Sequence, residues 1–446
     1  MIRNGKKKAI SCALVAAMSV GLAACGTTSY DFKVSYDGIK TGDVSSKVSV
    51  HDPSILKADG EYYIFGSHMS AAKSSDLLNW EKVADGYSKK NPVYGQIYDV
   101  ADEAFAYSGS KNSLIKTDDK QVHVWAPDVI YNETTGLYYM YYCTTSTWNA
   151  SNLCYGTSTT PEGPYEWQGA LIYSGFNRKT ISGTDVLDYV DEDYAYKNYI
   201  KGAQYNYEDY PNAIDPTVFY DADGRMWMVY GSWSGGIFLL EIDKTTGLVI
   251  HPEADKANNV DPYYGKRLLG GGHISIEGPY IMYDETSGYY YLFVSYGALT
   301  SNGGYQVRVF RSKTVDGEYV DMNGKYPEKS AQHQNFGLKL TGNYKLPSLE
   351  KAYMATGHNS AFVDDDGRMY LVYHTRFNDN GEGHSPRVHQ MLVNEDGWPC
   401  ELPYQTQGET VNKDGYDTDD IIGRYYVINQ GTAIDSKIAN PVILYL

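Results

Sequence analysis

One short pattern occurs five times along the chain and constrains the fold more than any other feature. Each copy has a short apolar strand, a turn that ends in glycine, and a second strand rich in aromatic residues. The Asp-Gly pairs at 59–60, 223–224 and 366–367 are strong β-hairpin signals. The copies begin at positions 52, 126, 215, 278 and 359, so successive starts are 74, 89, 63 and 81 residues apart. Each interval is long enough for four strands and their loops.

Repeated sheet units of this kind cannot bury both of their faces alone, and a ring of such units solves that problem. The sequence therefore predicts an all-β fold, a five-bladed β-propeller over residues 48–402, with the repeated strands nearest the central channel. The 45 tyrosines fit this prediction. Tyrosine suits half-buried strands, and its ring also suits surfaces that bind sugars.

The first 24 residues form an export signal: a positively charged start is followed by an apolar run that ends in small residues. The "LAAC" box at 22–25 resembles a bacterial lipoprotein cleavage site, which implies that Cys25 carries the lipid and that a linker follows over 25–47. An ordinary secretory signal is the alternative. In either case we expect an exported protein. A lipoprotein would be attached to a bacterial membrane through this lipid only, and the alternative is a secreted protein.

Charge and cysteine content exclude some classes of function. The net charge of −17 argues against nucleic acid as a partner, because phosphates require a basic surface. No cysteine cluster indicates a zinc site. Cys143 and Cys154 either form a disulfide or remain buried thiols. We expect a monomer.

A polar residue lies at or near the start of each repeated strand: Asp52, Asp128, Asp215, Glu277 and His358. Strands arranged around one axis bring such residues together. Asp52 and Asp215 occupy the same repeat position, Glu277 and His358 are expected one residue earlier, and Asp128 falls two residues later. Asp128 is therefore the weakest member of the group.

Two carboxyl groups in unequal environments are the equipment of glycoside hydrolysis, in which one activates water and the other protonates the leaving oxygen. A third acid nearby raises the pKa of the proton donor, because adjacent negative charges resist joint ionisation. Glu277 lies out of register with Asp52 and Asp215, and it is the best candidate for the donor.

Several motifs now identify a family. The chain resembles glycoside hydrolase family 43, and within it the endo-acting arabinanases, over roughly residues 48–400. The motifs are "HDPSI" from 51, "VWAPDV" from 124, "NAIDPTVF" from 212, "GSWSGGI" from 231, "SIEGPYI" from 275, "GHNSAF" from 357, "YHTRF" from 373 and "RVHQM" from 387.

The resemblance implies a mechanism that inverts the configuration at the reacting carbon. Asp52 would be the general base, Glu277 the general acid, and Asp215 would raise the pKa of Glu277 and orient it. An inverting mechanism needs room for water, so the carboxyl groups of Asp52 and Glu277 should lie roughly 6.5–9.5 Å apart.

The resemblance also implies further site residues. His358 would face calcium or a similar ion, held largely through water. Asn212 and Ser232 would bind substrate, and Trp125 would form an aromatic floor for a sugar ring. Arg387 would contact the sugar next to the scissile bond, with Arg376 as a rival. His51 and His374 are expected to point away from their catalytic neighbours and to be structural.

Two segments depart from the family pattern. Residues 174–212 form an insertion rich in tyrosine and acid, expected on the active-site face, with a flexible loop of no function as the alternative. Residues 403–446 resemble the start of a small β-domain appended to larger arabinanases. They are too few for a core of their own, so we expect a truncated module there.

The leading hypothesis is an endo-α-1,5-L-arabinanase that acts on plant arabinan and arabino-oligosaccharides. An exo-acting α-L-arabinofuranosidase or β-xylosidase would keep the same mechanism. A surface sugar-binding lipoprotein without catalysis is the hypothesis from another class, and it conflicts with the presence of all three acids.

Overall fold

A computed structural model describes residues 46–118, 121–146, 149–327, 333–377, 382–412 and 414–446. The predicted signal segment, Cys25 and nearly all of the 25–47 linker lie outside the described residues. None of the helices in the described part of the chain has the length and apolar character needed to cross a lipid bilayer.

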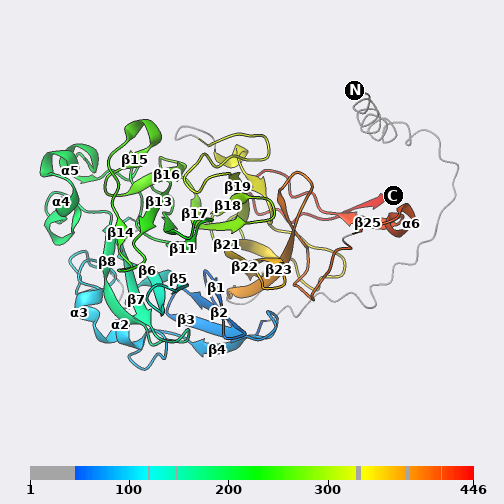
Figure 1. Cartoon of the computed structure of the whole chain (residues 1–446), viewed down its shortest axis with the longest axis horizontal. Helices are drawn as coiled ribbons and strands as arrows, with labels where there is room; N and C mark the ends of the chain where they lie inside the picture. Colours follow the sequence, from blue (N-terminus) through cyan, green and yellow to red (C-terminus); the bar gives the residue numbers. More distant parts are fainter. Residues whose placement is uncertain (1–45, 119–120, 147–148, 328–332, 378–381, 413) are drawn as a thin grey trace.

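Five antiparallel sheets surround one axis, which confirms the predicted five-bladed propeller (Figure 1). The first blade contains β1 (Ser54–Ala58), β2 (Glu61–Gly66), β3 (Ser70–Ser74) and β4 (Glu81–Ala84), and the second contains β5 (Val124–Asn132), β6 (Leu137–Thr145), β7 (Ser151–Ser158) and β8 (Glu166–Tyr173). The third contains β11 (Thr217–Tyr220), β12 (Met226–Tyr230), β13 (Ile237–Ile242) and β16 (Gly265–Leu269), with the short strands β14 (Val249–Ile250) and β15 (Val260–Asp261). The fourth contains β17 (Ile276–Asp284), β18 (Tyr289–Tyr296), β19 (Gln306–Ser312) and β20 (Leu338–Lys339), and the fifth contains β21 (Met354–Val363), β22 (Met369–Arg376), β23 (Ser385–Val393) and β24 (Pro399–Glu401).

The innermost strands β1, β5, β11, β17 and β21 are in contact with one another in that order. Contacts between β21 and β1 close the ring. The first hairpin has the predicted tight turn: Ala58 pairs with Glu61, and Asp59 and Gly60 between them both have positive φ. This is the backbone conformation that two-residue hairpin turns require.

The entry to each innermost strand has a left-handed backbone in all five blades. The residues and their φ values are Asp52 (56°), Ala126 (39°), Asp215 (54°), Gly278 (56°) and His358 (48°). His358 therefore occupies the same repeat position as Asp52 and Asp215, and the prediction that it comes one residue earlier is wrong. Glu277 does precede this position by one residue.

Two residues after the left-handed position of each innermost strand, a series of hydrogen bonds links neighbouring blades. Ser54 donates to the Asp128 carboxyl group, which also accepts the backbone N–H of Val218 at 2.6 Å. Thr217 donates to the Pro279 carbonyl at 2.8 Å, and Ser360 donates to that of Pro53 at 2.9 Å. Burial raises the pKa of Asp128 to about 7. Asp128 thus joins blades and lies outside the group of acids.

The 174–212 insertion contains helices and strands, so it is not the plain loop of the alternative, and its place on the active-site face stays a prediction. It contains η1 (Ile181–Gly183), α4 (Val186–Tyr189), α5 (Glu192–Asn198), β9 (Ile200–Lys201) and β10 (Gln204–Tyr205). Tyr199 is fully buried against Tyr264 of the third blade, with ring centroids 5.1 Å apart. Aromatic burial of this kind fastens the insertion to the outer part of the blade that follows Asp215.

The remaining elements lie outside the blades. They are α2 (Gly95–Asp99) and α3 (Ala101–Ala104) after the first blade, η2 (Lys256–Asn258), η3 (His333–Asn335), and, in the tail, α6 (Thr418–Ile421) with the hairpin β25 (Arg424–Val427) and β26 (Val442–Tyr445). The tail hairpin exposes much of its apolar surface, including Val442 and Tyr445. Cys143 and Cys154 are both free and buried, so the thiol alternative holds.

Candidate active site

Three acids and one histidine from four different blades meet at the entry to the innermost strands. Asp52 Oδ1 lies 3.0 Å from His358 Nδ1, and the Gly278 N–H donates to Asp215 Oδ2 at 3.2 Å. The fold therefore brings together Asp52 and Glu277, which are 225 residues apart in the sequence. Asp52, Asp215 and His358 have the left-handed entry conformation themselves, and Glu277 directly precedes Gly278, which has it in the fourth blade.

Asp52 is surrounded by histidines, which corrects one expectation. His51 Nε2 lies 3.1 Å from Asp52 Oδ1, and His374 Nδ1 lies 3.9 Å from the same oxygen and accepts the Asp52 backbone N–H at 3.4 Å. His51 and His374 do not point away from the site, because both rings border the candidate base. Ser67 also donates to Asp52 Oδ2.

These neighbours control the ionisation of Asp52. Burial works to raise the pKa of Asp52, but the adjacent histidines, His358 first, outweigh it and hold the pKa below its ordinary value. Asp52 is therefore a carboxylate at neutral pH, as a general base must be.

Glu277 lies in a cradle of three donors. Tyr305 donates to Oε1 at 2.7 Å, and Trp233 Nε1–H and Ser232 Oγ–H donate to Oε2 at 2.6 and 3.2 Å. Burial raises the pKa of Glu277, while the bonds from Tyr305 and Trp233 oppose the rise. The donors fix the direction of the carboxyl group, and its desolvation favours the protonated form.

Sequence reasoning missed Tyr305 and Trp233. Trp233 lies inside the quoted "GSWSGGI" motif and has a left-handed backbone with φ of 57°, which is unusual for a bulky residue. Tyr305 precedes β19 and is fully buried with its ring stacked on His374. Nothing distinguishes Tyr305 in the sequence from the other tyrosines of a tyrosine-rich chain.

Asp215 and Glu277 influence each other. Burial raises the pKa of Asp215 to about 7, with the charge of Glu277 adding to the rise and that of His358 opposing it. Two carboxyl groups that resist joint ionisation keep one proton between them near neutral pH. This pair can therefore supply a proton to a leaving group while Asp52 stays ionised.

His358 is the positive partner of the three acids. Burial lowers the pKa of His358, but the negative charges of Asp52, Asp215 and Glu277 outweigh it and raise the pKa above its ordinary value. A Cβ atom on Gly278 would lie 3.1 Å from the His358 ring, so glycine allows the close approach of the two blades. Among the described residues, the only polar partner of this ring is Asp52. Carboxylate oxygens and water are the ligands that calcium prefers, so the acids beside His358 are compatible with such an ion.

His51, His374 and His384 form a second group whose nitrogens lie within 4.8 Å of one another. The rings of His51 and His384 stack at 3.8 Å with only 23° between their planes. An imidazole binds a metal along a lone pair in the ring plane, and nearly parallel planes do not meet at one nearby point. The His374 ring lies edge-on to both, at 66° and 90°, so two stacked rings and one perpendicular ring lie beside Asp52, and the stacked pair does not aim its lone pairs at one ion in this arrangement.

The other predicted substrate-binding residues differ in how far they are buried. Trp125 is partly exposed and begins the same bulge in its blade that Glu277 begins in the fourth, which points it to the same end of the channel. Asn212 is buried and accepts a hydrogen bond from Ser151 at 2.8 Å. Ser232 contacts Glu277 itself. Their contacts with substrate stay predictions.

Arg387 has no exposed surface and packs against the rings of Phe377 and Tyr353, 5.1 and 5.7 Å from their centroids. In this structure it has no surface to offer a sugar. Its rival Arg376 lies beside His384 and reaches Glu382 Oε2 at 3.4 Å. A contact between Arg387 and sugar stays a prediction that would require the side chain to become accessible.

Comparisons with known proteins agree with this geometry. Residues 44–209 and 191–399 match the family model described as Glycosyl hydrolases family 43. The chain is 40% identical over 410 residues to "Extracellular endo-alpha-(1->5)-L-arabinanase" of Thermotoga petrophila, covering 89% of this chain and 79% of the relative. It is 36% identical over 429 residues to "Extracellular endo-alpha-(1->5)-L-arabinanase 2" of Bacillus subtilis, covering 90% and 80%. A crystal structure of the endo-1,5-alpha-L-arabinanase from Thermotoga petrophila superposes with a TM-score of 0.75 at 38% identity, covering 91% of this chain and 84% of that one.

Proposed function

This chain belongs to family 43 of the glycosyl hydrolases, and from that premise we propose that it is an inverting endo-α-1,5-L-arabinanase. Its substrate is arabinan, whose internal arabinofuranosidic bonds it cleaves. The observation that carries the proposal is the meeting of Asp52, Asp215 and Glu277 in a chain 36–40% identical to two endo-arabinanases.

In the proposed mechanism Asp52 removes a proton from water as the water attacks the anomeric carbon. Glu277 gives its proton to the glycosidic oxygen on the other side of that carbon. The negative charge of Asp215 keeps the proton on Glu277 until the glycosidic oxygen accepts it. After cleavage Asp52 holds one extra proton and Glu277 lacks one. Proton exchange with bulk water returns both carboxyl groups to their starting states once the products have left.

The length of the first products tests endo cleavage. Linear arabinan is digested briefly and the products are separated by anion-exchange chromatography. A mixture of oligosaccharides at early times supports the proposal. Release of arabinose alone would support the exo-acting alternative.

An ion is the proposed cofactor, and the support for it is chemical. His358 with the carboxylates around it would hold calcium or a similar ion, largely through water, and the ion would add positive charge beside the reacting sugar. We expect EDTA to lower activity and calcium to restore it. A chelated enzyme with full activity and an unchanged melting temperature would remove the ion from the mechanism.

We further propose that the protein is held at the outer surface of a membrane by lipid on Cys25. The support is the "LAAC" box in the sequence and the word "Extracellular" in the names of both relatives. Detergent-phase partitioning that survives a Cys25→Ser substitution would contradict this attachment.

Replacing Asp215 with asparagine is expected to move the alkaline limb of the pH–activity profile to lower pH. Glu277 must be protonated to act, and its proton is retained because the neighbouring carboxyl group resists a second negative charge. In the parent enzyme we expect kcat/KM to fall above about pH 7, near the pKa of Asp215. An alkaline limb at the same pH in both proteins would contradict the role of Asp215.

Replacing Tyr305 with phenylalanine is expected to have the opposite effect on that limb. The Tyr305 hydroxyl lowers the pKa of Glu277, so its removal raises the pKa and extends activity to higher pH. We also expect kcat to fall roughly 10–100-fold, because Tyr305 stabilises the negative charge that Glu277 gains as it gives up its proton, and one hydrogen bond to a charged group contributes roughly 1.5–3 kcal/mol. Tyr319→Phe, which removes a buried hydroxyl bond to Val315 in the same blade, is the control. Equal behaviour of the two variants would show that Tyr305 acts only through packing.

A further inference from the structure

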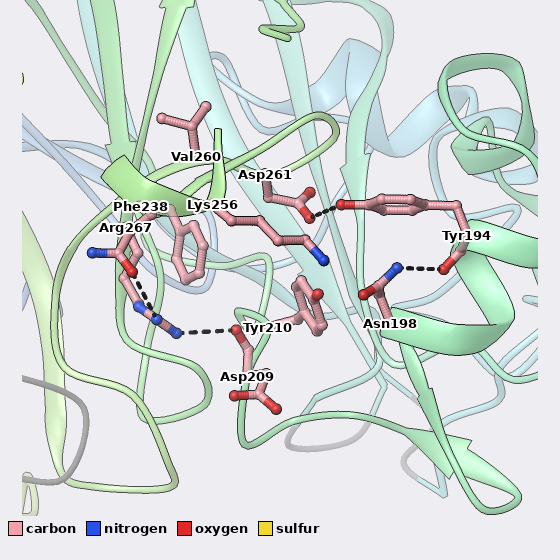
Figure 2. A pocket seen from close by; sticks show the side chains of 10 residues that line it. Tyr194, Asn198, Asp209, Tyr210, Phe238, Lys256, Val260, Asp261 and Arg267 are labelled. Atoms are coloured by element: carbon pink, nitrogen blue, oxygen red, sulfur yellow. Dashed lines mark hydrogen bonds between the residues drawn. The ribbon is translucent and has the colours of Figure 1, made fainter. Parts of the chain in front are cut away.

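A pocket lies outside the catalytic group, between the 174–212 insertion and the outer edge of the third blade (Figure 2). Its volume is about 220 Å³, and its walls come from α5, the turn at 209–210, η2 and strands β13, β15 and β16. Pockets for drug-sized ligands usually measure ~300–1,000 Å³. This one is therefore suited to a single small ring.

One wall of the pocket is aromatic and rigid. The Tyr210 ring packs edge-on against Tyr199, with centroids 4.7 Å apart, and lies 5.5 Å from Tyr264. Tyr194 and Tyr199 are held in place through their hydroxyl groups, which donate to Asp261 at 3.3 and 2.8 Å. A sugar ring that packs on such a wall orders no side chain on binding, so little conformational entropy is lost.

The pocket also carries hydrogen-bond donors. Within the described residues the Arg267 side chain makes two long bonds, at 3.5 Å to the Asp209 carbonyl and 3.4 Å to Asn259, so it has further N–H donors to offer a ligand. Lys256 extends into the pocket in Figure 2, and its ammonium group has no hydrogen-bond or ion-pair partner among the described residues.

The charges that line the pocket balance. Lys256 and Arg267 contribute two positive charges, and Asp209 and Asp261 bring two carboxyl groups. A lining with donors and acceptors but no net charge favours a neutral, hydroxyl-rich ligand over an anion or a cation. Aromatic rings next to polar groups form a surface suited to a sugar.

The pocket is connected to the catalytic group through short contacts. The Tyr210 backbone lies against Gly235, where an added Cβ atom would come within 2.3 Å of it. Gly235 follows Trp233 by two residues, and Trp233 donates to Glu277. Tyr210 itself precedes Asn212 by two residues. The segment that lines the pocket at 209–210 therefore packs against the loop that carries Trp233 to Glu277.

We infer that this pocket binds an arabinofuranosyl residue of the polymer at a distance from the bond that is cleaved. This inference rests on the proposed function, since it takes the ligand from the same substrate. Such a second contact would strengthen the binding of long chains. It would not change the binding of fragments too short to reach both the catalytic acids and the pocket.

The experiment measures polymer binding in a protein whose turnover is strongly slowed. Lys256→Ala and Arg267→Ala, singly and together, are placed in the Glu277→Gln background, and migration is followed in native gels containing debranched arabinan. We expect the double variant to bind about tenfold more weakly, as for the loss of one charged hydrogen bond. Lys90→Ala, an exposed lysine outside the pocket, is the matched control.

A parallel arm compares kcat/KM on polymer with kcat/KM on a short arabino-oligosaccharide, in proteins that retain Glu277. We expect the ratio of the two to fall in the pocket variants. Unchanged binding and an unchanged ratio would overturn the inference, as would an equal loss on both substrates. An equal loss of binding to a β-galactan would overturn the assignment to arabinofuranosyl residues. If the parent protein hydrolysed neither substrate, the proposed function would fail, while the gel experiment would still test the pocket.

Discussion

Replacing Glu277 with glutamine is expected to lower kcat on arabinan by about 10²–10⁴-fold, which is the usual contribution of a general acid. Glutamine keeps the size of the side chain, and Tyr305 can still donate to its oxygen. What it loses is a transferable proton, so the glycosidic oxygen would have to leave as an alkoxide. The measurement is the initial rate of reducing-end release.

The leaving group supplies the control for this variant. An arabino-oligosaccharide with a 4-nitrophenyl group at its reducing end releases a stable phenolate, which needs no proton. We expect the Glu277→Gln variant to lose much less activity on this substrate than on arabinan. A loss of the same size on both would mean that Glu277 has another role, such as binding the sugar.

The repeat pattern predicted the fold because it reports on local chemistry. Asp59-Gly60 can form a two-residue turn with positive φ at both positions, and the structure has that turn. The other four hairpins have longer loops, and together the five hairpins limit the ways in which the sheets can be covered. The assembly of Asp52, Asp215 and Glu277 followed from the ring, since equivalent positions in a ring face the same axis.

The register at His358 and the histidines around Asp52 could not be predicted in the same way. A strand period of two places His51 opposite Asp52, but the left-handed backbone at Asp52 turns the chain and brings both side chains to one side. Tyr305 and Trp233 reach Glu277 from loops, whose paths depend on tertiary packing. The sequence carries alternation and turn chemistry, and it carries little information about where a loop will direct its side chains.

The second large effect is expected for Asp52→Asn. Asparagine accepts the left-handed conformation that Asp52 adopts, with φ of 56°, so the fold should be kept. We expect kcat to fall by about 10²–10⁴-fold because water would attack without losing its proton to a base. The pKa of His358 should fall as well, since Asp52 is the charge that raises it most. Titration of this histidine by NMR gives a readout that does not depend on catalysis.

Azide distinguishes a missing base from a damaged site, because it is a nucleophile with no proton to remove. If Asp52 is the base, azide added to the Asp52→Asn variant should restore part of the rate and give a glycosyl azide of inverted configuration. The parent enzyme should release a first product of inverted configuration, which fits a water molecule between carboxyl groups roughly 6.5–9.5 Å apart. A first product of retained configuration would instead make Asp52 a nucleophile, with the two carboxyl groups about 5 Å apart. In that case the histidines around Asp52 would serve to keep a nucleophile ionised, and the water would have to enter only after the leaving group had gone.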